Sequence, residues 1–131
     1  MEINNFKKGN YLEYRKGHHG MIKFYAKVNE LKENVVICIN KNGETIEEEF
    51  VPIELNSDIM IKIGFKKRGE TYTKNIDGYF IQWIDLPQFT KLLTISHQGK
   101  DDFMHKHNIS YLHELQNAFY IMTNQEMNIL L

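Results

Sequence analysis

Alternating hydrophobic and polar positions dominate the first half of this chain. Within residues 21–28 the apolar side chains occupy every second position, at Ile22, Phe24, Ala26 and Val28. A period of two is typical of a strand with one buried face. Residues 11–14 alternate in the same way, and residues 45–50 read as an acidic, edge-like strand. This half of the chain therefore predicts a meander of strands.

A continuous apolar run at residues 35–40 interrupts the alternation and predicts a central strand. It leads into Lys41-Asn42-Gly43-Glu44. Asn42 and Gly43 both tolerate a positive φ, so they predict a two-residue hairpin between this strand and the next one.

Turn-forming residues divide the chain after residue 50. Pro52 is expected to end the acidic strand, Asn56 or Ser57 to cap a short helix over residues 58–63, and Gly64 to stop it. Beyond this point, breaks at glycine, asparagine and proline separate short strand-like segments. The predicted strands are residues 65–68, 71–74, 79–84, 92–97 and 103–109, and residues 127–131 form an extended tail.

Residues 111–123 predict one amphipathic helix. Ser110 suits its N-cap, and Asn124 suits the left-handed position that follows a helix. At about 100° per residue, one side of the helix is apolar, with Tyr111, Leu112, Leu115, Ala118, Phe119 and Met122. The opposite side carries polar and amphipathic side chains, namely His113, Gln116, Asn117 and Tyr120. We expect Leu115 and Phe119 to be buried against the second set of strands, and the polar side to face outward.

These elements predict an α+β fold, because the strands are not interleaved with long helices. An N-terminal β-meander or small barrel-like sheet comes first. A short helix and then an antiparallel sheet covered by the C-terminal amphipathic helix follow it. The length of 131 residues favours a single domain over residues 1–131, with a subdivision near residues 52–64 as the alternative.

Composition narrows the classes of function. The net charge is −1, which argues against a protein that binds nucleic acid mainly by electrostatic attraction. Cys38 is the one cysteine, so no intramolecular disulfide can form, and its apolar neighbours predict a buried, reduced thiol. Neither a secretory signal nor an apolar run of the roughly 20 residues that a membrane span needs is visible. We expect a soluble, cytoplasmic protein that does not associate with membranes.

The polar side of the terminal helix is the leading candidate for a binding surface. His113, Gln116, Asn117 and Tyr120 both donate and accept hydrogen bonds, and they lose less entropy on fixing than lysine or glutamate would. One interpretation is a recognition surface. The other is an ordinary solvated helix face, which binds nothing.

The C-terminal residues also resemble a known family. The segment Tyr111-Leu112-His113-Glu114-Leu115-Gln116-Asn117 and the later Thr123-Asn124-Gln125-Glu126-Met127 are similar to a strand–helix signature. This signature closes small uncharacterised proteins of Bacteroidetes, their prophages and their phages. Lys62-Ile63-Gly64-Phe65 resembles the middle segment of that family, and Gly9-Asn10-Tyr11 resembles its start more weakly. Asn124 replaces the family's glycine. The resemblance implies an origin in a phage or mobile element, and it supplies no catalytic residues.

Two further groups of residues are candidates for binding a ligand or a metal ion. Lys66 and Arg68 lie in a short cationic cluster that precedes Tyr72 and Trp83. Cations interleaved with aromatic residues can bind nucleotides or single strands by stacking, although such aromatics more often fill a core. His105 and His107 would share one face of a strand and could approach a cation, but a polar strand is the simpler interpretation. We expect no bound metal and no cofactor.

These observations favour a non-enzymatic accessory protein of a phage or mobile element. Such a protein would act in the host cytoplasm as an inhibitor of a host anti-phage defence protein, or as a sponge for a small nucleotide-like signal molecule. A nucleic-acid-binding accessory module is the first alternative, and a metal-dependent enzyme is the second. Salt-sensitive retention on DNA or RNA would distinguish the first alternative, and loss of activity on chelation would distinguish the second.

Overall fold

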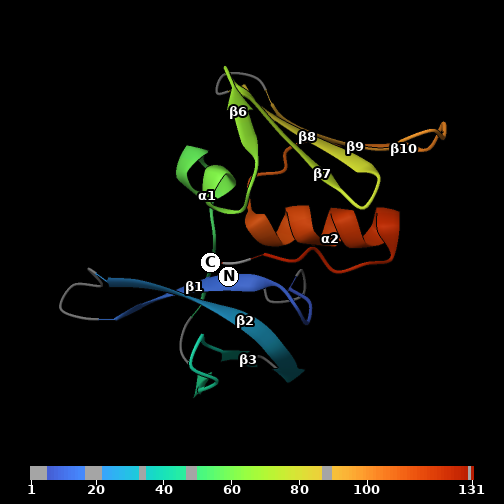
Figure 1. Cartoon of the computed structure of the whole chain (residues 1–131). Helices are drawn as coiled ribbons and strands as arrows, with labels where there is room; N and C mark the ends of the chain where they lie inside the picture. The colour runs from blue at the N-terminus through green and yellow to red at the C-terminus, as the bar shows by residue number, and fades with distance from the viewer. Residues whose placement is uncertain (1–5, 17–21, 33–34, 47–49, 87–89, 130) are drawn as a thin grey trace. The chain divides into compact units, whose positions relative to one another are not determined.

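The computed structural model describes residues 6–16, 22–32, 35–46, 50–86, 90–129 and 131. The chain divides into two compact units. The first contains residues 1–53 and 111–117, and the second contains residues 54–110 and 118–131. Within the described residues the fold is α+β, as predicted, with two antiparallel sheets, a short helix and a C-terminal helix (Figure 1).

The first unit contains a sheet in the order β4-β3-β2-β1-β5. Its strands are β1 (Tyr11–Lys16), β2 (Ile22–Lys32), β3 (Val35–Ile39), β4 (Thr45–Ile46) and β5 (Val51–Pro52). The strands β1 to β4 form the predicted meander, and β5 pairs with the free side of β1. Because β4 and β5 are its two edges, the described part of this sheet is not a closed barrel. Met21 and residues 47–49 of the predicted strands lie outside the described residues.

Alternate residues along the strands of the first sheet form its hydrophobic core. Leu12 pairs with Ala26, and both are buried on the same face as Tyr14, Val28 and Cys38. Burial raises the pKa of the Cys38 thiol to about 12, so this cysteine stays protonated and unreactive near neutrality. The prediction of a buried thiol is confirmed.

Two details of the first sheet differ from the sequence prediction. The loop between β3 and β4 is longer than a two-residue turn: Asn40 accepts the N–H of Gly43, and only Gly43 has a positive φ there. A loop of this kind ends in a left-handed glycine next to a bulge. Pro52 is the last residue of β5, which is a separate strand from β4, and an edge position there tolerates its missing N–H.

The short helix α1 (Ser57–Lys62) begins the second unit's ordered structure. Asn56 is its N-cap and accepts the N–H of Ile59 at 2.9 Å, as predicted. Gly64 follows the helix with a φ of 100°. The Nζ atom of Lys74 donates to the Ile63 carbonyl at 2.7 Å, which satisfies an end group of the helix, and burial lowers the pKa of this lysine.

The second sheet has the order β10-β9-β8-β7-β6 and is antiparallel throughout. Its strands are β6 (Lys66–Arg68), β7 (Thr71–Ile76), β8 (Tyr79–Asp85), β9 (Lys91–His97) and β10 (Phe103–Lys106). Asp77 and Gly78 both have a positive φ and join β7 to β8 as a two-residue turn. The last strand ends before the predicted residue 109.

The helix α2 (Leu112–Thr123) follows. It starts one residue later than a Ser110 cap would require, and the N–H of Tyr111 donates to the Glu114 carboxylate at 3.0 Å. Asn124 adopts the expected left-handed conformation after the helix. Within the second unit, Phe119 is fully buried and its ring lies edge-on to Tyr79 of β8 at 6.3 Å between centroids. The second half of α2 therefore covers one face of the second sheet, as predicted.

Candidate functional site

Gln116 on α2 is not exposed but is part of the first unit's interior, where its side chain is 5 % exposed. Its Oε1 accepts the backbone N–H of Tyr11 at 2.9 Å, and its Nε2 donates to the Gly9 carbonyl at 3.0 Å. One side-chain amide thus satisfies a donor and an acceptor of the segment that enters β1. The expectation that Gln116 lies on a solvated face is wrong.

Asn117 takes part in the same connection. Its Oδ1 accepts a hydrogen bond from the Asn10 side chain at 2.9 Å, and the Asn10 Oδ1 accepts the N–H of Lys7 at 2.7 Å. The backbone of Asn10 is tied to β2, because its carbonyl accepts the N–H of Val28 at 2.7 Å. The two amides of α2 therefore hold the start of β1 rather than await a ligand.

His113 is also buried, with 4 % of its surface exposed. Phe6 lies edge-on to its ring at 4.8 Å, and Tyr111 stacks on it at 5.9 Å. Among the described residues, its Nδ1 has no hydrogen-bond partner. Burial lowers the pKa of His113, against a smaller raising effect of Glu114. Of the four residues on the predicted polar side of the helix, Tyr120 is the exposed one, at 47 %.

Helical periodicity separates an apolar side from a polar side but does not show what lies against the polar side, so it could not predict the burial of His113 and Gln116. The signal that could have predicted this burial is the presence of the side-chain amides of Gln116 and Asn117 together with a turn at Gly9 and Asn10. Asn and Gln side chains can hydrogen-bond to backbone N–H and C=O groups that have no partner in a helix or sheet, at a point where such a segment lies against a helix.

Tyr72 and Trp83 are core residues rather than recognition aromatics. Both are buried, they are paired across β7 and β8, and their rings lie 5.5 Å apart. The Nε1 of Trp83 donates to the Ile109 carbonyl at 2.9 Å, so its polar atom is also satisfied internally. The simpler interpretation of these two aromatics is therefore correct, and their proposed binding role has no accessible surface.

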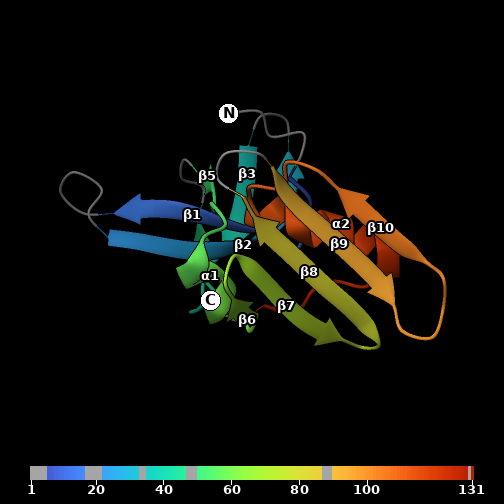
Figure 2. The same ribbon diagram turned by 90° about the horizontal axis from the view of Figure 1, so that it is seen from above.

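The face of the second sheet opposite Tyr72 and Trp83 is exposed or partly exposed. Residues that alternate with the buried positions form what we call the outer face, and none of them is buried. Figure 2 looks onto this side of the second unit, where β7, β8 and β9 lie in front of α2. Lys66 and Arg68 belong to this face and are exposed, so the structure separates these two cations from Tyr72 and Trp83.

Three cross-strand rows make up the outer face. The first row runs across β7, β8, β9 and β10 through Asn75, Phe80, Ser96 and Phe103. The second row crosses all five strands through Lys66, Thr73, Gln82, Thr94 and His105. The third row starts at β6 and runs through Arg68, Thr71, Ile84 and Leu92.

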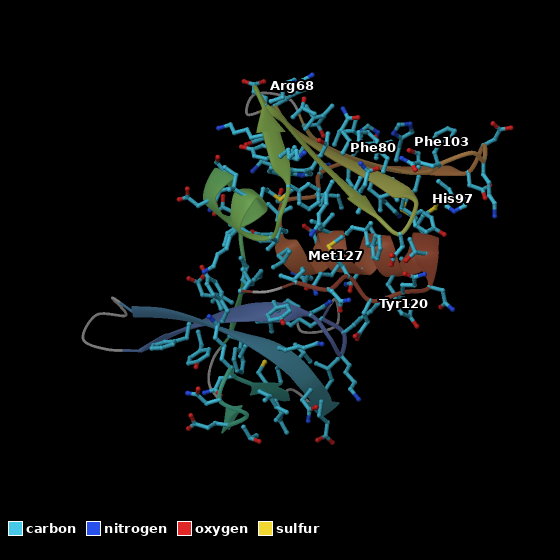
Figure 3. The ribbon with its side chains drawn as sticks, viewed as in Figure 1. Arg68, Phe80, His97, Phe103, Tyr120 and Met127 are labelled. Carbon is cyan, nitrogen blue, oxygen red and sulfur yellow. The ribbon has the colours of Figure 1, made fainter. Side chains whose placement is uncertain are left out.

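Phe80 and Phe103 are the aromatic residues of this face, and both project away from the α2 side of the sheet (Figure 3). Phe103 is 63 % exposed and Phe80 is partly exposed. They flank the small Ser96, so two strand spacings of about 4.8 Å separate them, roughly 9.6 Å. Their alternation with Ile81, which is buried, and Met104, which is partly buried, is the sequence signal that could have identified them.

His105 completes the aromatic end of the outer face. Its ring lies edge-on to Phe103 at 5.0 Å, and its Nδ1 is 3.0 Å from the Thr94 hydroxyl. His107 follows β10 and is exposed. Among the residues that the structure describes, no group of three histidine, cysteine, aspartate or glutamate side chains is placed to hold a metal ion.

The chemistry of the outer face follows from its side chains. The aromatic rings and Ile84 offer flat or apolar contact, and the threonines, Asn75 and Gln82 offer neutral hydrogen bonds. Lys66 and Arg68 add positive charge, and no aspartate or glutamate occurs in the three rows. This arrangement can bind a flat or anionic partner without unfavourable charge contacts.

Neither helix of the described chain has the length and apolar character that crossing a membrane requires. Comparison with known proteins adds no relative: the chain matches no protein-family model, no curated protein and no solved structure.

Proposed function

We propose that this chain is a binding protein and that the outer face of the second sheet is its binding surface. The observation that carries the proposal is the exposure of Phe103 at 63 % on a sheet face that also presents Phe80 and whose three rows of described residues contain no carboxylate. A large aromatic residue left in water loses hydrophobic stabilisation, and a partner that covers it recovers this stabilisation.

The rigidity of the surface supports a binding role. The outer face is built on paired strands, whose opposite side is anchored by Ile81, Trp83, Leu93 and Ile95, all fully buried. Strands anchored in this way fix the backbone positions of the outer-face residues on β8 and β9, so a partner would lose little free energy in ordering that backbone.

We also propose that the protein comes from a phage or mobile element. This proposal rests on the resemblance of Tyr111-Leu112-His113-Glu114-Leu115-Gln116-Asn117 to phage and prophage proteins. In that setting the protein would be an accessory factor that acts in the host cytoplasm. It would bind and block a host defence protein or retain a small nucleotide-like signal. Because His113 and Gln116 are buried, we propose the outer face rather than α2 as the contact surface.

Site-specific photo-crosslinking tests the proposed surface. Phe103 is replaced by the photo-reactive p-benzoylphenylalanine, and the protein is irradiated in bacterial lysate. The control carries the same group at Ile121, which is exposed to nearly the same extent, at 61 %. We expect an adduct at position 103 that is absent at position 121 and is lost on Phe80→Ala. An equal adduct pattern at both positions, or none at either, would contradict the proposed surface.

A further inference from the structure

We propose that the outer face binds single-stranded nucleic acid, with bases stacked on Phe80 and Phe103 and phosphates held by Lys66 and Arg68. This inference rests on the proposal that the outer face is the binding surface, and it names single-stranded nucleic acid as the partner in place of a host protein or a small signal. Four observations carry it: the exposed aromatic pair, the neutral hydrogen-bonding row between the edges, the cations at one edge, and the lack of carboxylates in the three rows.

The aromatic end provides the stacking contacts. Every base has a flat π-face, so an aromatic side chain that can turn its own face towards a base can stack on any base. Phe103 is the more accessible ring, and its contact with His105 at 5.0 Å extends the aromatic area along β10. Phe80 lies on the other side of Ser96, whose small side chain leaves space between the two rings.

The cationic end lies at the opposite edge of the same face. The strand order places β10 and β6 four spacings apart, about 19 Å at roughly 4.8 Å per spacing. A single strand that crosses the sheet from Phe103 to Lys66 would place about five nucleotides on it, at a stacked rise of about 3.4 Å each. Thr73, Gln82 and Thr94 lie along this path and can hydrogen-bond to base edges or sugars.

Charge complementarity favours this partner. The whole chain has a net charge of −1, yet the outer face carries Lys66 and Arg68 without a compensating carboxylate in its rows. With two phosphate contacts, the logarithm of the association constant should fall with the logarithm of salt concentration with a slope of about −1.4. Binding would thus depend on stacking more than on counterion release, which reconciles nucleic-acid binding with the balanced composition.

A direct binding assay tests the inference. Fluorescently labelled oligothymidylate and oligouridylate of about ten nucleotides, long enough to exceed the estimated span, are titrated with the full chain. A duplex of the same length is the comparison, because its bases are not free to stack on the protein. We expect both single strands, or one of them, to bind, and Phe103→Ala and Phe80→Ala each to weaken binding by about 5- to 150-fold.

Matched variants separate stacking from folding and from charge. Phe103→Trp should retain binding, and Ile121→Ala, at a similarly exposed position, should leave it unchanged. The double variant Lys66→Ala with Arg68→Ala should flatten the salt dependence towards zero. Equal affinity for the duplex, or single-strand binding that neither phenylalanine variant weakens, would overturn the inference.

The two proposals can fail separately. If the photo-crosslinker at position 103 captures a partner that a protease but not a nuclease removes, and no single strand binds, the outer face remains a binding surface and the nucleic-acid inference is wrong. If position 103 captures nothing and no single strand binds, both proposals are wrong.

Discussion

The side-chain oxygen of Gln116 on α2 accepts the backbone N–H of Tyr11, 105 residues earlier in the chain, at 2.9 Å. The nitrogen of the same amide donates to the Gly9 carbonyl. A glutamine expected to face solvent thus joins the first strand of the chain to the first half of its last helix. Neither backbone group would easily find another partner if this buried amide were removed.

Gln116→Ala should therefore destabilise the fold by about 1–3 kcal/mol, because it leaves a buried N–H and a buried C=O unsatisfied. Urea unfolding followed by circular dichroism measures this change. Gln125→Ala is the matched control, since Gln125 is exposed beyond the helix, and it should change stability by no more than about 0.5 kcal/mol. Equal stability of the two variants would mean that the Gln116 hydrogen bonds do not form in solution.

A pair of phenylalanine variants tests which residues form the core of the second unit. Phe119 is fully buried beside Tyr79, and Phe103 is largely exposed. Phe119→Ala should lower the free energy of unfolding by about 3–5 kcal/mol, and Phe103→Ala by no more than about 0.5 kcal/mol. Thermal unfolding of both proteins under the same conditions checks the difference. Reversed or equal effects would show that α2 does not cover the sheet as described.

The burial of His113 predicts that the protein loses stability in mild acid. Burial lowers its pKa in the folded state below the value of 6.5 that the unfolded chain has, so the unfolded state binds more protons between the two values. Titration of His113 should therefore leave the free energy of unfolding unchanged above pH 6.5. It should lower this free energy as the pH falls from 6.5 towards the folded pKa.

The contribution of His113 can be isolated by variants. His113→Leu removes the titrating group, so its stability should decline less than that of the unmodified protein below pH 6.5. Gln125→Leu, at an exposed position without a titratable group, should follow the unmodified protein. An NMR titration that placed the His113 pKa at or above 6.5 would contradict the burial argument.

Folding should not require a metal ion. The chain has enough length to build its two cores from apolar side chains, and the described residues place no three ligands together. We expect the melting temperature to stay the same when a chelator such as EDTA is added. A drop of many degrees, or stoichiometric zinc or iron in protein purified without added metal, would show that a metal contributes.

The elements near the middle of the chain show what local sequence can specify. Asn56 and Gly64 set the two ends of α1, because a cap and a left-handed glycine depend on residues within one turn of each other. The strands β7 to β9 were predicted within a few residues of their bounds, because their alternation and the turn at Gly78 are also local signals. These signals led to the correct α+β class.

The candidate site shows what local sequence could not specify. Alternation divides β7 and β8 each into two faces, but it could not determine that Tyr72 and Trp83 would lie on the covered face and Phe80 on the open one. The outer face also depends on strand order, because Phe103 and Lys66 share it only after five strands align. Register between distant strands depends on contacts that no short segment contains.

The sequence by itself determined the types of its elements, most of their ends, and the buried positions Cys38, Leu115 and Phe119. Only the tertiary structure decided that His113 and Gln116 are interior, and that Phe80 and Phe103 face solvent. The physical reason is that propensity and periodicity act over a few residues, whereas burial depends on which distant segment lies against a side chain. For Gln116 that segment is the turn at Gly9, which lies 107 residues away along the chain.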